Sequence, residues 1–298
     1  MKKYRCTDRK KKFGDRYDGF RVRKIDPIIN LMPVIMKSRN ASHCMINTDV
    51  DIENMEKYIR VKRREDLPHL GILHVFVAAL VRATSERPRL NRFIAGKKLY
   101  ARNYIRVSLV VKKSMNLDAD EAVIMPYFMP TDTIYDVYEK INTAVAECKD
   151  EGAEANSTGK MAKFFSYIPT WLLSIIVSLV SFLDYFGLMP KFINRASPFH
   201  SSYFITDIGS VGADAVYHHL YDFGTMSAFF AIGRKKTTNE LDSDGNVKRK
   251  RCITIKIEID ERIADGFYTN SSLEIVRKYL LKPQMLETAP EKIVYDYS

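Results

Sequence analysis

Residues 252–268, C-I-T-I-K-I-E-I-D-E-R-I-A-D-G-F-Y, leave little freedom in how this chain can fold. The isoleucines at positions 253, 255, 257 and 259 alternate with polar residues. A period of two places every isoleucine on one face of a β-strand. We therefore expect a strand with one buried face and one solvent-exposed face.

The strand runs directly into a charged motif, D-E-R-I-A-D-G, at residues 260–266. Charged groups at the end of an apolar strand must pair or reach solvent, because an unpaired buried charge costs several kcal/mol. The motif therefore predicts either a charged turn that closes the strand or a loop that holds reactive groups.

This motif resembles D-H-R-x-x-D-G, the closing motif of the acyltransferase subunits of 2-oxo acid dehydrogenase complexes, which share a superfamily with chloramphenicol acetyltransferase. Four further stretches resemble motifs of the family in the same order: residues 36–43 (weakly), P-R-L-N at 88–91, F-I-T-D-I-G-S-V-G at 204–212 and A-F-F-A-I-G-R at 228–234. The resemblance spans residues 21–290. It implies an α/β two-layer sandwich with a central mixed sheet, assembled as a homotrimer with active sites between neighbouring subunits.

The sequence departs from the family at one central position. The family's catalytic histidine takes the proton from the coenzyme A thiol or from the acceptor, and Glu261 stands at that position. Asp260, Arg262, Asp265 and Gly266 match the motif. The resemblance implies that Glu261 is the base, that Asp265 holds the loop by pairing with an arginine, and that the other three support the site.

A glutamate is a weak substitute for a histidine base. Its ordinary pKa of about 4.3 lies about four units below that of a thiol, which corresponds to roughly 6 kcal/mol. Burial would raise the pKa of Glu261, whereas the charge of Arg262 would lower it. His218 and His219 are either recruited replacements or packing residues.

Thr206 matches the family serine that donates its hydroxyl to the oxyanion of the tetrahedral intermediate. The resemblance implies that Thr206 reaches the Glu261 of a neighbouring subunit, and one such donor contributes a few kcal/mol. A threonine at the end of a strand is the plainer interpretation. Asp207 replaces the family's asparagine and adds a negative charge nearby.

Composition limits the class of protein. The chain has 298 residues and a net charge of +11, of which much lies in a basic arm at residues 1–20. We interpret residues 21–298 as one catalytic domain. The four cysteines form neither a metal-ligand pattern nor a disulfide framework, which favours a cytoplasmic protein. No metal, no nucleic-acid partner and no lipoyl domain are expected, and the arm is expected to be mobile or lightly docked.

Residues 152–198 form an insertion that the family lacks. No charge occurs between Tyr167 and Leu183, yet a helix of that length is short for a bilayer, and a single crossing would split the sheet. Three interpretations stay open: a lid or wall on the domain, an interfacial helix at residues 164–193 on the inner face of the membrane, or an oligomer contact.

The periodicity of the remaining sequence predicts helices that begin near Asp51, cover 70–81 and 133–148, and follow the closing motif at 271–281. A hairpin with basic legs is predicted around residues 242–246. These legs would attract the phosphates of coenzyme A or be solvated.

Two functions follow. The first is transfer of an acyl group from an acyl-coenzyme A thioester to an unidentified acceptor. The alternative is a catalytically inactive trimeric scaffold of the same fold that docks on a membrane surface or a partner.

Overall fold

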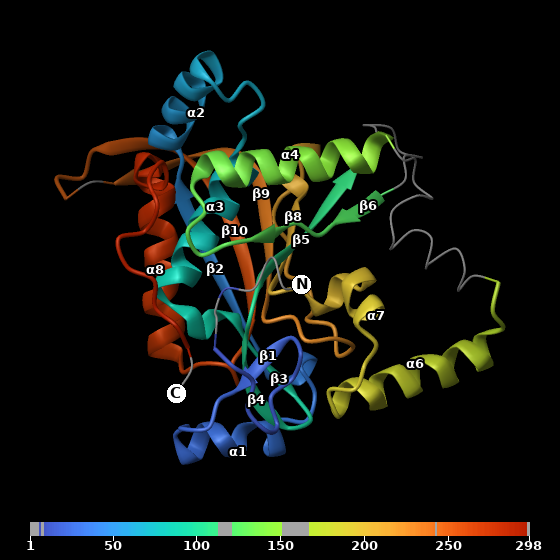
Figure 1. Cartoon of the computed structure of the whole chain (residues 1–298). Coiled ribbons are helices and arrows are strands. Elements are labelled where there is room, and N and C mark those ends of the chain that lie inside the picture. Colours follow the sequence, from blue (N-terminus) through green and yellow to red (C-terminus); the bar gives the residue numbers. More distant parts are fainter. Residues whose placement is uncertain (1–5, 7–8, 113–120, 151–166, 242, 297–298) are drawn as a thin grey trace.

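The computed structural model describes residues 6, 9–112, 121–150, 167–241 and 243–296 (Figure 1). Its centre is a mixed seven-stranded sheet in the order β2-β10-β9-β8-β5-β6, with β7 paired to β5. The pairs β5–β8 and β8–β9 are parallel and the others are antiparallel. The strands of this sheet are β2 (His43–Asp51), β5 (Ile105–Lys112), β6 (Glu121–Ile124), β7 (Tyr127–Phe128), β8 (Tyr203–Asp207), β9 (Ala228–Leu241) and β10 (Val247–Asp260).

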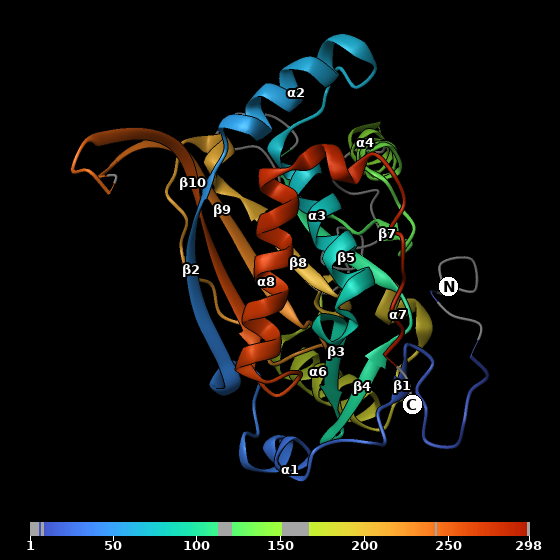
Figure 2. The same cartoon turned by 90° about the vertical axis from the view of Figure 1, so that its left-hand side faces the viewer.

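The helices form the second layer. Figure 2 shows α3 and α8 side by side on one face of the sheet. The described helices are α1 (Pro27–Ile35), α2 (Glu53–Glu65), α3 (Ile72–Glu86), α4 (Ile134–Asp150), α6 (Thr170–Tyr185), α7 (Lys191–Ala196) and α8 (Gly266–Leu281). The four alternating isoleucines of β10 are buried beneath this layer. The predicted two-layer α/β sandwich with a central mixed sheet is confirmed.

Several predicted elements differ only at their ends. The helix after the closing motif begins five residues earlier than expected, at Gly266, because Asp265 caps it. Residues 121–128 form two short strands, β6 and β7, separated around Pro126, whose missing N–H interrupts the ladder.

The second face of β10 is not uniformly exposed to solvent, contrary to the sequence-based expectation. Glu258 and Asp260 are 0 % and 1 % exposed. The loop at residues 212–227 covers this part of the sheet, where Leu220 and Met226 pack against Phe229. The alternating pattern therefore predicted which face of β10 each side chain lies on. It did not predict that a loop covers the polar side chains at the C-terminal end of this strand.

A small second sheet, ordered β1-β4-β3, fixes part of the basic arm. It consists of β1 (Gly19–Arg21), β3 (Arg92–Ala95) and β4 (Lys98–Arg102). Arg16 and Asp18 precede β1, are buried and form an ion pair with an Nε–Oδ1 distance of 2.8 Å. Residues 15–20 are therefore integral to the fold, not lightly docked.

The insertion contains α6 and α7, and residues 152–166 of it lie outside the described residues. Figure 1 shows α6 extending away from the body. Within this helix only Asp184, in the last turn, is buried. In the single chain α6 is thus not a wall packed on the domain. None of the described helices is long and apolar enough to cross a bilayer.

Candidate functional site

The loop after β10 is held by a buried ion pair between Asp260 and Arg262. The Arg262 guanidinium donates from Nε and Nη2 to the two carboxylate oxygens of Asp260 at 2.8 and 2.7 Å. Its Nη1 donates to the carbonyl of Met36 at 2.9 Å. A second arginine, Arg39, places its Nε 3.7 Å from Asp260 Oδ2. A bidentate pair of this kind fixes the loop geometrically as well as electrostatically.

Glu261 is half-buried at the start of this loop. Its backbone N–H donates to the carbonyl of Ser42 at 2.9 Å, which ties the loop to the residue before β2. Its carboxylate Oε2 accepts a hydrogen bond from the Cys44 thiol, with an S–O distance of 3.2 Å. The guanidinium of Arg262 is directed to Asp260, so the cation that adjoins Glu261 in sequence is already neutralised by another carboxylate.

Cys44 is a site residue that the sequence analysis missed. Burial, followed by the hydrogen bond and the charge of Glu261, raises the pKa of the Cys44 thiol to about 11. The thiol therefore remains protonated at neutral pH and acts as the donor to Glu261. No pattern in the sequence signalled this contact, because it depends on the pairing of β2 with β10, which sets Cys44 opposite Ile259.

Asp265 does not form the arginine pair that the resemblance implied. Its carboxylate accepts a hydrogen bond from the Tyr268 backbone N–H at 2.8 Å and caps α8. Arg262, the arginine of the same motif, pairs with Asp260 and not with Asp265. At Gly266, an added Cβ would have no neighbour within 4 Å, so the fold of one chain does not itself require glycine there.

Thr206 lies well away from Glu261 in the single chain. It is the penultimate residue of β8 and pairs in register with Ala231 of β9, which in turn pairs with Lys256 of β10. Since β9 is parallel to β8 and antiparallel to β10, the C-terminal ends of β8 and β10 point in opposite directions. Five residues along β10 and two strand spacings across separate Thr206 from Glu261, a distance of about 20 Å. One chain does not bring these two residues together.

A basic cleft opens beside the end of β8. Its volume is about 440 Å³, and it lies between α2, the 3₁₀ turn Ile208–Val211 and the start of the β9–β10 hairpin. Four basic residues line it, namely Arg60, Arg63, Lys235 and Arg251. The acids that also line it are Glu56, which pairs with Lys235 and Arg251, and Asp207. Burial raises the pKa of Asp207, whose carboxylate accepts the Ser210 backbone N–H.

A second cleft, of about 310 Å³, lies at the Glu261 end of the sheet. Pro33 of α1 lines one side of it, and Ser181 and Tyr185 of α6 line the other. Arg39 and Arg262, the two arginines around Asp260, also line it. This cleft therefore reaches the ion pair that holds the Glu261 loop.

Glu258 is a further ionisable group, and the alternating pattern of β10 predicted that it would be exposed to solvent. Its Oε1 accepts the backbone N–H of His218 at 2.8 Å, while its Oε2 is buried and finds no hydrogen-bond partner in the described part of the chain. Burial raises the pKa of Glu258 to about 7. The His218 ring stacks on Phe229 with centroids 4.2 Å apart, so the structure favours a packing role for His218.

The described cysteines are free, and no group of three His, Cys, Asp or Glu side chains in the described part of the chain is arranged to hold a metal ion.

Comparison with known proteins identifies the fold. No family model and no curated protein sequence matches the chain. A probable dihydrolipoamide acetyltransferase from Listeria monocytogenes is 16 % identical, with a TM-score of 0.56 over 87 % of this chain and 95 % of that one. Dihydrolipoamide acetyltransferase from Azotobacter vinelandii is 12 % identical, with a TM-score of 0.55 over 89 % and 93 % of the two chains. Chloramphenicol acetyltransferase is 11 % identical, with a TM-score of 0.50 over 86 % of this chain and 96 % of that one.

At these identities the comparisons show the fold alone. The predicted structural resemblance to the acyltransferase domains and to chloramphenicol acetyltransferase is confirmed.

Proposed function

We propose that this chain is an acyltransferase that moves an acyl group from a coenzyme A thioester to an acceptor, with Glu261 as the general base. The observation that carries the proposal is the hydrogen bond from the Cys44 thiol to Glu261 Oε2, 3.2 Å long. A base must lie within hydrogen-bonding reach of the proton it removes, and Glu261 already accepts one from a thiol. The acyltransferases among the structural neighbours support the reaction class.

The site needs two subunits. Glu261 and Thr206 lie about 20 Å apart in one chain. A homotrimer in which Thr206 of one subunit meets Glu261 of the next would complete the site. Thr206 also lies on the sheet face opposite α3 and α8. Phe204, two residues before it in β8, and Ala231, its partner in β9, both belong to the apolar cluster on that face.

In the proposed reaction Glu261 takes the proton of the acceptor as the acceptor attacks the thioester carbonyl. The carbonyl becomes an oxyanion, which the Thr206 hydroxyl of the neighbouring subunit stabilises by a hydrogen bond. Collapse of this intermediate breaks the carbon–sulfur bond. The departing coenzyme A thiolate then takes the proton from Glu261, which restores the carboxylate.

The basic cleft at the end of β8 suits the phosphates of coenzyme A. Arg60 and Arg63 approach it from α2, and Lys235 and Arg251 approach from the hairpin. Charge-assisted hydrogen bonds from such groups are stronger than those between neutral partners. This gives the basic hairpin legs a role in holding the donor.

The first test is acetyl-coenzyme A cleavage by wild type, Glu261→Gln and Glu261→His, preceded by calorimetric binding of coenzyme A. We expect Glu261→Gln to lose about 10²-fold to 10⁴-fold in rate, as removal of a general base does. Glu261→His supplies an imidazole, the base of the family's motif, and should react faster than wild type.

Glu274→Gln is the matched control, because Glu274 is an exposed glutamate on α8 outside the site. It should react like wild type. If the wild type binds neither coenzyme A nor its acetyl thioester, the proposal is wrong.

The cleft is tested separately by Arg60→Ala and Arg64→Ala. Both arginines are exposed on α2, but only Arg60 lines the cleft. We expect Arg60→Ala to weaken calorimetric binding of coenzyme A about tenfold, since it removes one charged hydrogen bond. Arg64→Ala should bind normally, and equal effects of the two substitutions would argue against phosphate binding in this cleft.

The alternative function is a catalytically inactive trimeric binding or scaffold protein of the same fold that associates peripherally with a membrane. It is favoured by Glu261 in the place of the family's histidine and by the Asp260–Arg262 pair, which holds the loop whether or not the site is active. Coenzyme A binding separates the two functions, because a scaffold has no need to keep the donor site.

A further inference from the structure

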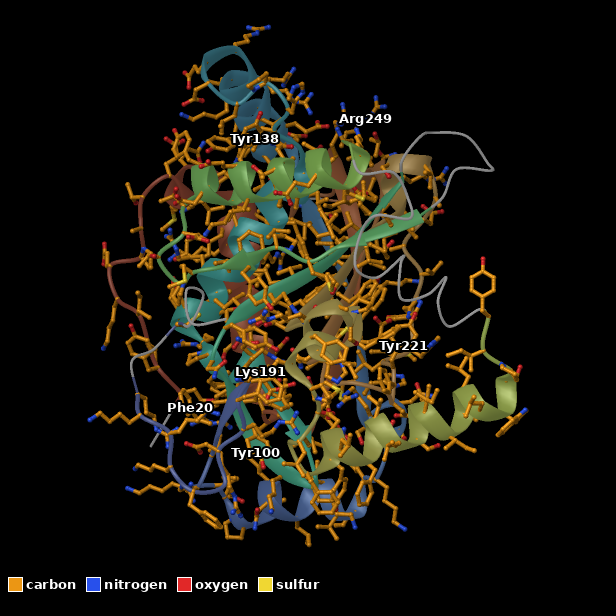
Figure 3. The ribbon with its side chains drawn as sticks, turned by 45° about the vertical axis from the view of Figure 1, so that its right-hand side comes forward. Phe20, Tyr100, Tyr138, Lys191, Tyr221 and Arg249 are labelled. Carbon is orange, nitrogen blue, oxygen red and sulfur yellow. The ribbon has the colours of Figure 1, made fainter. Side chains whose placement is uncertain are left out.

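The helix α6 presents an apolar face directed away from the body. Trp171, Ile175, Leu179, Phe182 and Phe186 follow one another at intervals of three or four residues, which places them along one side of the helix. Each of them is more than half exposed. In Figure 3, α6 stands clear of the body along most of its length. A soluble domain seldom leaves such a surface without a partner.

A second apolar helix lies at the same end of the molecule. α1 has the sequence P-I-I-N-L-M-P-V-I and carries no charge. It exposes four large apolar side chains: Ile28, Leu31, Val34 and Ile35. Both helices line the 310 Å³ cleft, α1 through Pro33 and α6 through Ser181 and Tyr185. Figures 1 and 2 agree that α1 and α6 lie at the end opposite α2 and α4.

The charged residues around these two helices are mainly basic. Lys37 and Lys97 line the cleft between them, and the flanking segments add further exposed cations. The exposed basic residues at positions 23–37, 97–98 and 191–195 are Arg23, Lys24, Lys37, Lys97, Lys98, Lys191 and Arg195, against the exposed acids Asp26 and, at the cleft, Asp222. An apolar surface with a basic border is complementary to an anionic bilayer, in which acyl chains lie below negative headgroups.

We propose that α1 and the outer face of α6 together dock on the surface of an anionic lipid bilayer. Trp171 begins the exposed face and Tyr185 ends the helix, and such amphipathic rings favour the headgroup level of a membrane. The described helices are too short or too polar to span a bilayer, so the attachment is interfacial. The docking does not depend on acyl transfer.

The test uses the full chain and two kinds of vesicle, phosphatidylcholine alone and phosphatidylcholine mixed with phosphatidylglycerol. Trp171 is the single tryptophan of the sequence, so intrinsic fluorescence reports on α6 directly. We expect the protein to float with the mixed vesicles, and the Trp171 emission to shift to shorter wavelength. Salt should weaken this binding, because it screens exposed charges. A chain that does not float with the mixed vesicles at low salt overturns the proposal.

Matched variants locate the surface. Ile28→Asp in α1 and Phe182→Asp in α6 should each weaken vesicle binding at least about tenfold, since each removes a large apolar side chain that would be buried in the bilayer. Leu241→Asp is the control: Leu241 is 72 % exposed, as is Ile28, but it lies on the β9–β10 hairpin. Figure 3 places Arg249 of that hairpin at the end of the molecule opposite α1.

Charge reversal gives an independent measurement. Lys37→Glu with Lys97→Glu should remove the preference for the mixed vesicles while leaving the apolar faces intact. Helix variants that float as well as wild type overturn the proposal. So does a helix variant that lowers the oligomeric mass but floats normally, because that result assigns the surface to a second copy of the chain.

Discussion

Glu258 places a carboxyl group between the sheet and the loop at residues 212–227. It is fully buried, and one of its oxygens has no hydrogen-bond partner among the described residues. The sequence placed Glu258 correctly on the polar side of β10. It gave no indication that the loop would cover that side, because the covering residues Leu220 and Met226 are distant in sequence and carry no periodic pattern.

The raised pKa of Glu258 makes stability depend on pH. Burial raises this pKa from 4.5 in the unfolded chain to about 7 in the fold. Between these values the folded state keeps a proton that the unfolded state has released, so the free energy of unfolding falls as pH rises. The loss reaches about 3 kcal/mol by pH 7 and grows little above it.

Urea unfolding of wild type and Glu258→Gln at several pH values measures this effect. Relative to wild type, Glu258→Gln should gain up to about 3 kcal/mol between pH 4.5 and pH 7.5, because the amide has no proton to release. The exposed Glu274→Gln variant should keep the wild-type dependence. If Glu258→Gln also keeps it, Glu258 does not titrate in this window.

At the scale of elements, α6 is attached to the body by its last turn. Arg16 donates from Nη2 to Asp184 Oδ1 at 2.6 Å, and His200 places its Nε2 3.6 Å from Asp184 Oδ2. Burial opposes a charge on Asp184, yet the contacts with His200 and Arg16 outweigh it and hold the pKa of the carboxyl well below its usual range. The carbonyl of Tyr185 packs directly against Gly96, where a Cβ would collide with it.

Asp184→Asn should therefore release the helix. The substitution leaves Arg16 buried with Asp18 as its remaining carboxylate, and we expect a loss of about 3 kcal/mol in the free energy of unfolding. Limited proteolysis should also cut within 170–185 faster. Asp214→Asn is the control, because Asp214 pairs with Arg234 at 2.9 Å on the surface, where such a pair contributes less than about 1 kcal/mol. Equal losses in both variants would contradict the anchoring role.

The elements that could be predicted from the sequence were those with a regular period. The alternating isoleucines gave β10, and the uncharged stretch after Tyr167 gave α6. The anchor of α6 could not be predicted, because it joins Asp184 to Arg16 across 168 residues. Similarly, the resemblance located Glu261 and Thr206, but the Cys44 contact depends on the register between β2 and β10, which no local pattern encodes.

At the scale of the whole molecule, the sheet itself separates the two proposed catalytic residues. Thr206 and Glu261 end strands that run in opposite directions, with β9 between them. A change of side-chain rotamer cannot bridge about 20 Å. If the chain is active, the site must be shared, and sedimentation should show a closed trimer.

A shared site can be detected by complementation. Thr206→Val removes the hydroxyl with little change of shape, and Glu261→Gln removes the base, so each variant alone should be nearly inactive. In trimers formed by co-expression, every mixed trimer contains one interface at which an intact Glu261 meets an intact Thr206. Random assembly at equal expression then restores about a quarter of the wild-type sites. Homotrimers purified separately and mixed without unfolding should stay inactive. If co-expression restores no activity while the wild type is active, Thr206 and Glu261 do not share a site between subunits. The proposed pairing of the two residues is then wrong.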